Sequence, residues 1–91
     1  MRRDLELDGN RIYSEEDFHQ VISLLFALPK TYPNDISSLE EFMHTYVDPN
    51  FTLNWTNHQL SKQQLGYNFD RIVSAFDDFQ SAHPLFKFYL N

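Results

Sequence analysis

The chain has 91 residues, 42% of them hydrophobic and 16% aromatic, which suits one compact core and leaves no room for a second. We therefore predict a single domain over residues 1–91. The formal net charge of −6 argues against direct binding to nucleic acid or to an anionic membrane, because both need clustered Lys and Arg. The chain has no cysteine, which excludes disulfides and cysteine-bound metals and fits a reducing, cytoplasmic location.

Neither a leader peptide nor a membrane span is expected from the sequence. Met1-Arg2-Arg3-Asp4 begins with basic residues, but no apolar segment of leader length follows them. The longest apolar run, residues 24–28, is far too short to cross a bilayer.

The first half of the chain predicts one strand and two helices. Residues 4–8 alternate polar and apolar and end in a Gly9-Asn10 turn. Ser14 has capping-box spacing to an acid three residues later, so we predict a helix over residues 14–27 that Pro29 terminates. A second helix begins after residues 33–35, where Asn34 or Asp35 can cap it. Its predicted buried stripe is Ile36, Leu39, Met43 and Tyr46, with Phe42 at the edge and Ser37, Glu41 and Thr45 opposite.

The second half predicts two strands around two helices. Residues 51–55 alternate as a strand, and residues 56–65 form a short helix closed by Gly66. Asn68 is the predicted cap of the next helix, which ends at His83-Pro84. Residues 86–90 are apolar on both faces, which predicts a strand in the middle of the sheet. The outer side of the last helix is Asp70, Ser74, Asp77, Asp78 and Ser81.

Strands separated by helical segments require crossover connections and therefore a parallel sheet. The predicted fold class is α/β, with a three-stranded parallel sheet and three to four helices packed mainly on one face.

The stretch from Thr31 to Ser61 has no Lys or Arg but contains Asp35, Glu40, Glu41 and Asp48. One interpretation is a solvated surface that keeps the protein soluble. The other is a face for a basic partner, in which a loop and an amphipathic helix supply the contacts.

Few residue patterns in the sequence indicate a catalytic site or a metal site. The four histidines have no metal-ligand spacing, and we expect no metal or cofactor. Ser37, His44 and Glu41 are imaginable as a hydrolytic set, but neighbours on one helix face usually lack a pocket and oxyanion donors. We therefore expect a protein that is not an enzyme.

Short segments along nearly the whole chain resemble a known family in their order and spacing. The segments are Leu7-Asp8-Gly9-Asn10-Arg11-Ile12, Asp17-Phe18-His19, Ala27-Leu28-Pro29, Tyr32 with Leu39 and Glu41, Leu53-Asn54-Trp55, Ser61-Lys62-Gln63, and Phe76 with Asp78. Together they make the chain similar to barstar-type ribonuclease inhibitors.

The resemblance implies a barstar-like fold and an inhibitor that lays its second helix and the preceding loop across the active site of a basic ribonuclease or related nuclease toxin. Glu41 falls at the family's principal acidic position and Asp78 at a second one. The free inhibitor is expected to be a monomer. The residues expected to bind the partner are Thr31, Tyr32, Asn34, Asp35, Ser37, Ser38, Glu41, His44, Thr45 and Asp78.

An alternative remains open at the same surface. Where the family's namesake has Tyr, Gly, Asp and Trp, this chain has Thr31, Pro33, Ser37 and Glu40. The alternative is an interaction or regulatory module of the same fold whose partner is not a nuclease.

Overall fold

The computed structural model describes residues 3–91, so Met1 and Arg2 of the N-terminal segment lie outside the described residues. The elements are β1 (Arg3–Asp8), a 3₁₀ turn η1 (Gly9–Arg11), α1 (Glu15–Leu25), α2 (Ile36–Tyr46), β2 (Phe51–Thr56), α3 (His58–Leu65), α4 (Tyr67–Ala82) and β3 (Lys87–Leu90). The predicted α/β class is confirmed, with four α-helices and a three-stranded parallel sheet. None of the helices in residues 3–91 is both long and apolar enough to cross a membrane.

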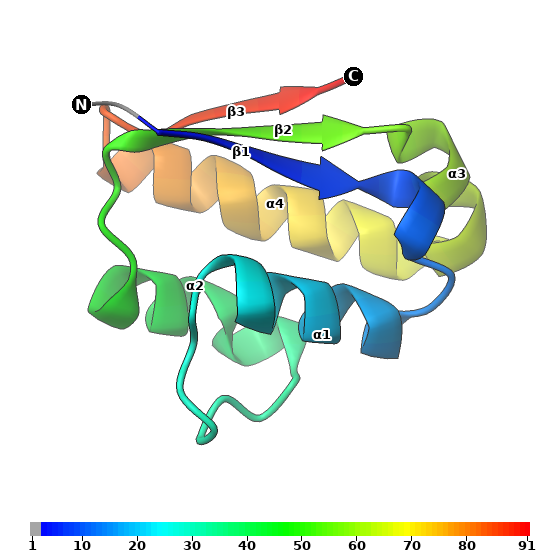
Figure 1. Cartoon of the computed structure of the whole chain (residues 1–91), viewed down its shortest axis with the longest axis horizontal. Helices are drawn as coiled ribbons and strands as arrows, with labels where there is room; N and C mark the ends of the chain where they lie inside the picture. The colour runs from blue at the N-terminus through cyan, green and yellow to red at the C-terminus, as the bar shows by residue number, and fades with distance from the viewer. Residues whose placement is uncertain (1–2) are drawn as a thin grey trace.

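The helices α1, α2 and α4 lie on one side of the sheet, and α3 lies at the end where β1 and β2 finish (Figure 1). The burial pattern of strand β2 explains why the helices cover one side. Its residues Phe51, Leu53 and Trp55 are fully buried, while the residues between them are only half-buried. A strand with one apolar and one polar face fits a sheet that is covered on one face. The loop between α1 and α2 projects on the side away from the sheet (Figure 1).

The strand order is β1-β2-β3, so the prediction that the last strand lies in the middle of the sheet is wrong. Phe86 is fully buried but precedes β3, and Phe88 packs on Phe76 of α4 with ring centroids 4.9 Å apart. Tyr89 and Leu90 are substantially exposed, which an edge strand allows. In a sheet covered on one face, an apolar pattern on both faces therefore does not identify the central strand.

Trp55 is the centre of the core. Its ring stacks on Phe18 of α1 at 5.7 Å and packs against Phe69 of α4 at 5.0 Å. Its indole N–H donates to the buried Ser61 hydroxyl of α3 at 3.0 Å, so the polar atom of the side chain is satisfied. One side chain thus joins the sheet to three helices.

The helix starts follow the predicted chemistry with one exception. Ser14 Oγ accepts from the Asp17 N–H at 3.1 Å, and Asp35 Oδ1 accepts from the Ser37 N–H at 3.0 Å, so Asp35 is the cap of α2. The predicted cap Asn68 is wrong, because α4 begins at Tyr67 after Gly66. The Asn68 side chain instead donates to Glu15 Oε2 of α1 at 3.3 Å.

Candidate functional site

The candidate site begins with the loop between α1 and α2, which is held to the body of the protein by Tyr32. The Tyr32 side chain is only 5% exposed, and its ring packs edge-on against Phe42 of α2 at 5.2 Å. Its hydroxyl lies 2.8 Å from Nδ1 of the buried His19 in α1. Tyr32 is expected among the partner contacts, and its burial shows that it fixes the position of the loop.

The proton positions in this buried chain follow from Glu15. The Glu15 carboxylate lies 3.1 Å from His19 Nε2 and can only accept, so Nε2 of a neutral His19 carries the hydrogen. His19 Nδ1 must then accept from the Tyr32 hydroxyl. Burial, followed by the negative charges of Asp35 and Glu15, raises the pKa of Tyr32 well above its usual value. The loop is therefore tied down by a hydroxyl that stays protonated.

Thr31, Asn34 and Asp35 of the loop are exposed. Asn34 has a positive φ of 57°, a left-handed conformation that asparagine tolerates better than most residues. The loop thus presents polar side chains to solvent directly before α2, whose first turn is capped by Asp35.

Helix α2 presents two polar faces. Glu41 and Thr45 are exposed, as predicted, and the Thr45 hydroxyl donates to the Glu41 carbonyl at 3.0 Å. Ser38 is half-buried.

Tyr46 was predicted to be buried with the apolar stripe, but at the last position of the helix it is 52% exposed.

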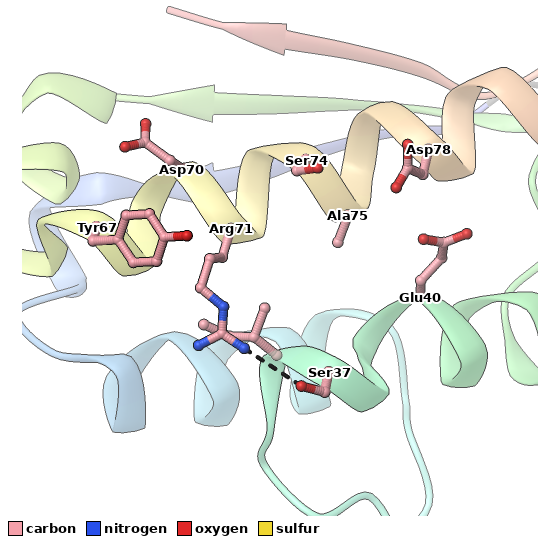
Figure 2. A pocket seen from close by; sticks show the side chains of 9 residues that line it. Ser37, Glu40, Tyr67, Asp70, Arg71, Ser74, Ala75 and Asp78 are labelled. Carbon is pink, nitrogen blue, oxygen red and sulfur yellow. Dashed lines mark hydrogen bonds between the residues drawn. The ribbon is translucent and has the colours of Figure 1, made fainter.

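The second polar face of α2 meets α4 along a groove of about 410 Å³, which we call the α2–α4 groove. Its lining residues are Ile36, Ser37, Glu40, Tyr67, Asp70, Arg71, Ser74, Ala75 and Asp78. Figure 2 shows the side chains of Glu40 and Asp78 directed toward one another from opposite sides of it. On the same view, Arg71 reaches across to α2, where its guanidinium donates to Ser37 Oγ at 3.4 Å.

The groove brings together two of the expected site residues, Ser37 and Asp78. Glu41 lies on the adjacent outer face of α2 and is not part of the lining. The lining also contains Glu40 of α2 and Asp70 and Arg71 of α4, which were not among the residues expected to bind the partner. Asp70, Ser74 and Asp78, four residues apart, mark one face of α4, but the sequence alone does not say that this face lies beside α2.

The imagined hydrolytic set does not assemble. Ser37 Oγ accepts a hydrogen bond from Arg71, whereas His44 lies within hydrogen-bond distance of Glu40 and His83. His44 Nδ1 is 2.7 Å from His83 Nε2, and His44 Nε2 is 3.2 Å from Glu40 Oε2. The serine and the histidine therefore have other partners. Across residues 3–91, no three His, Cys or acidic side chains converge as a metal site would require.

These features define a class of protein: a small α/β fold with a one-sided parallel sheet and an acidic two-helix surface next to an anchored loop. The family model described as Barstar (barnase inhibitor) matches residues 2–91, and the chain belongs to that family. No curated protein matches the chain as a relative.

Proposed function

We propose that the protein inhibits a basic ribonuclease of the barnase class by covering its active site, and that it has no enzymatic activity of its own. The observation that carries the proposal is the acidic surface on α2 and α4 of a chain in the Barstar family. Glu40 and Asp78 face one another across the groove, and Glu41 lies on the exposed side next to them.

The physical argument is charge complementarity. An enzyme that binds the RNA backbone has a positive cleft, which focuses the electrostatic potential and attracts acidic surfaces. The α2 helix offers such a surface in a rigid form, because Ile36, Leu39 and Met43 bury its other side in the core. A helix held in this way loses little backbone freedom on binding, which favours affinity, and its charge favours the encounter rate.

The loop belongs to the same proposed interface. Thr31, Asn34, Asp35 and Ser38 lie before and in the first turn of α2, and His44 and Thr45 lie in its last turns. Tyr32 supports this surface from within. In this proposal the inhibitor is a cytoplasmic monomer when free, makes no direct contact with RNA, and needs no cofactor.

The test is RNA cleavage by barnase, as the probe ribonuclease, in the presence of the protein and its variants. We expect Glu41→Ala and Asp78→Ala each to weaken inhibition about tenfold or more, as loss of an interfacial charge anchor does. Asp77→Ala is the matched control, because Asp77 is an exposed acid in the same helix that does not line the groove.

Equal inhibition by all three variants would overturn the site assignment. If the unmodified protein leaves barnase and other basic ribonucleases fully active, the function itself is wrong. The alternative, a module for a partner that is not a nuclease, would then account for the same fold.

A further inference from the structure

The contact between His44 and His83 joins the last turn of α2 to the residue that caps the C-terminus of α4. The two ring nitrogens are 2.7 Å apart, and the ring centroids are 4.8 Å apart. Phe79 of α4 packs against both imidazoles, at 5.0 Å from His44 and 4.5 Å from His83. The pair therefore ties α2 to the C-terminal end of α4, which leads into β3. Neither histidine lines the groove.

The protonation of this pair can be assigned from Glu40. A carboxylate only accepts hydrogen bonds, so His44 Nε2, 3.2 Å from Glu40 Oε2, carries a hydrogen. In a neutral His44 the other nitrogen, Nδ1, is then an acceptor. His83 must donate to it from its own Nε2–H. The result is a directed chain in which His83 donates to His44 and His44 donates to Glu40.

One added proton leaves this chain intact. It can go to His83 Nδ1, the nitrogen that faces neither His44 nor Glu40, so that the imidazolium still donates from Nε2 to His44 Nδ1 and this bond becomes charge-assisted, while His44 Nε2 still donates to Glu40. A second proton removes the last acceptor, because both rings then carry hydrogen on every nitrogen. Two cations at hydrogen-bond distance also repel one another.

The charged groups around the pair do not prevent this. Glu40 on α2 faces His44 directly, and Asp78 on α4 faces Glu40 across the groove (Figure 2). Phe79, which packs against both imidazoles, is apolar. The two carboxylates lower the repulsion between the rings, but they supply no acceptor between the two facing nitrogens.

The arrangement of Glu40, His44 and His83 fits a hydrogen-bonded chain better than a metal site. Only His44 Nδ1 and His83 Nε2 point at one another, while Glu40 lies on the opposite nitrogen of His44. Bound metals usually have three or four protein ligands.

We propose that Glu40, His44 and His83 form a proton-controlled latch between α2 and the C-terminal end of α4. The latch is closed while the two imidazoles hold at most one added proton, and it opens when both are cationic. The open form binds more protons than the closed form, so closure is lost as the pH falls. Opening releases the side chain of His44, which belongs to the proposed interface, and adds positive charge to an acidic face.

The first test uses the free, full-length protein. Ring ¹⁵N chemical shifts at about pH 8, where histidine is normally neutral, should show hydrogen on Nε2 and none on Nδ1 for both His44 and His83. On acidification, the through-space NMR contacts between the ring protons of His44 and His83 should disappear once both rings are cationic. Hydrogen on Nδ1 of His44 at high pH, or contacts that persist when both rings are cationic, would overturn the proposal.

A substitution separates the latch from other effects of acid. The amide of His83→Gln can donate to Nδ1 of a neutral His44 and, through its carbonyl, accept from Nδ1 of a cationic His44, and it takes up no proton itself. The contact between α2 and α4 should therefore survive acidification. His83→Ala should lack the contact at every pH. His58→Gln is the matched control, because His58 hydrogen-bonds the Asn91 carbonyl away from the pair, and it should behave as the unmodified protein does. Acid opening of His83→Gln to the same extent as the unmodified protein would overturn the proposal.

The consequence for binding rests on the proposed function. Going from about pH 7.5 to about pH 5, across the usual titration range of histidine, barnase should dissociate about fivefold faster from the unmodified protein than from His83→Gln. The ratio between the two proteins cancels any titration of the ribonuclease. If barnase does not bind at all, the proposed function fails while the two tests on the free protein still decide the latch.

Discussion

Tyr32 shows how one buried hydroxyl positions a surface loop. Its ring lies between His19 and Phe42, and its hydroxyl supplies the hydrogen that His19 Nδ1 accepts. We expect Tyr32→Phe to lower the free energy of unfolding by about 1 to 3 kcal/mol, because a buried acceptor is left without a donor. Urea denaturation at neutral pH measures this. The matched control is Tyr13→Phe, whose side chain is 66% exposed and whose effect should stay within about 0.5 kcal/mol.

Tyr32 also predicts a loss of folding stability at alkaline pH. Burial and the charges of Asp35 and Glu15 raise the pKa of Tyr32 in the folded protein above its unfolded value of about 10. The folded state therefore holds this proton more tightly than the unfolded state does. Its contribution to stability is complete below about pH 10 and is lost as the pH rises above that value.

Urea denaturation at several pH values above neutrality tests this sign. The unmodified protein should lose stability more steeply on passing pH 10 than Tyr32→Phe does. Parallel curves for the two proteins would show that Tyr32 ionises equally in the folded and unfolded states.

At the scale of elements, η1 is packed against the start of α3 with no space for a side chain. A Cβ at Gly9 would lie 2.7 Å from Ser61 Oγ and even closer to the backbone carbonyl of Asn57. Because a backbone carbonyl cannot rotate away, Gly9→Ala should destabilise the protein by about 1 to 3 kcal/mol. The comparison is Gly66→Ala, where a Cβ meets no atom within 4 Å and only the positive φ of 58° costs stability. Thermal unfolding with and without each substitution distinguishes crowding from backbone strain.

The α2–α4 groove also contains a charge that opposes the proposed partner. Arg71 projects into it and donates to Ser37 Oγ at 3.4 Å. Removing this cation with Arg71→Gln should speed association with a basic ribonuclease about twofold or more, since rim charges act mainly on encounter. Stopped-flow association with barnase measures the rate. Lys62→Gln removes a positive charge from α3, outside the groove, and serves as the control. A slower association of Arg71→Gln would instead make Arg71 a partner contact.

The positions of helices and strands along the chain were more predictable than the way these elements lie beside one another. The caps at Ser14 and Asp35 and the periodic apolar positions determine the helices locally, and sequence spacing reports such local interactions well. Strand order depends on which face of the sheet is covered, and residues 86–90 carry no signal for that. Their apolar side chains satisfy an edge strand as well as a central one.

The site was predictable to a similar extent. Glu41 follows from the α2 periodicity, whereas the pairing of Glu40 with Asp78 needs two helices to be placed side by side. The contact between His44 and His83, 39 positions apart in sequence, is non-local in the same way. Single-helix patterns identify which residues face outward, but they do not identify what those residues face.

At the scale of the whole molecule, the net charge of −6 and the groove acids predict a strong effect of salt on association. Electrostatic steering acts over the Debye length, which shrinks to about 8 Å near physiological ionic strength. Association with barnase should therefore slow as salt is added, while dissociation changes less. Glu41→Gln and Asp77→Asn each remove one negative charge, but only Glu41 lies in the proposed interface. Steering by total charge would reduce the salt dependence equally in both variants. Steering by the α2 face would reduce the salt dependence more in Glu41→Gln, which is the result we expect. An association rate that does not change with salt would show that packing rather than charge governs the encounter.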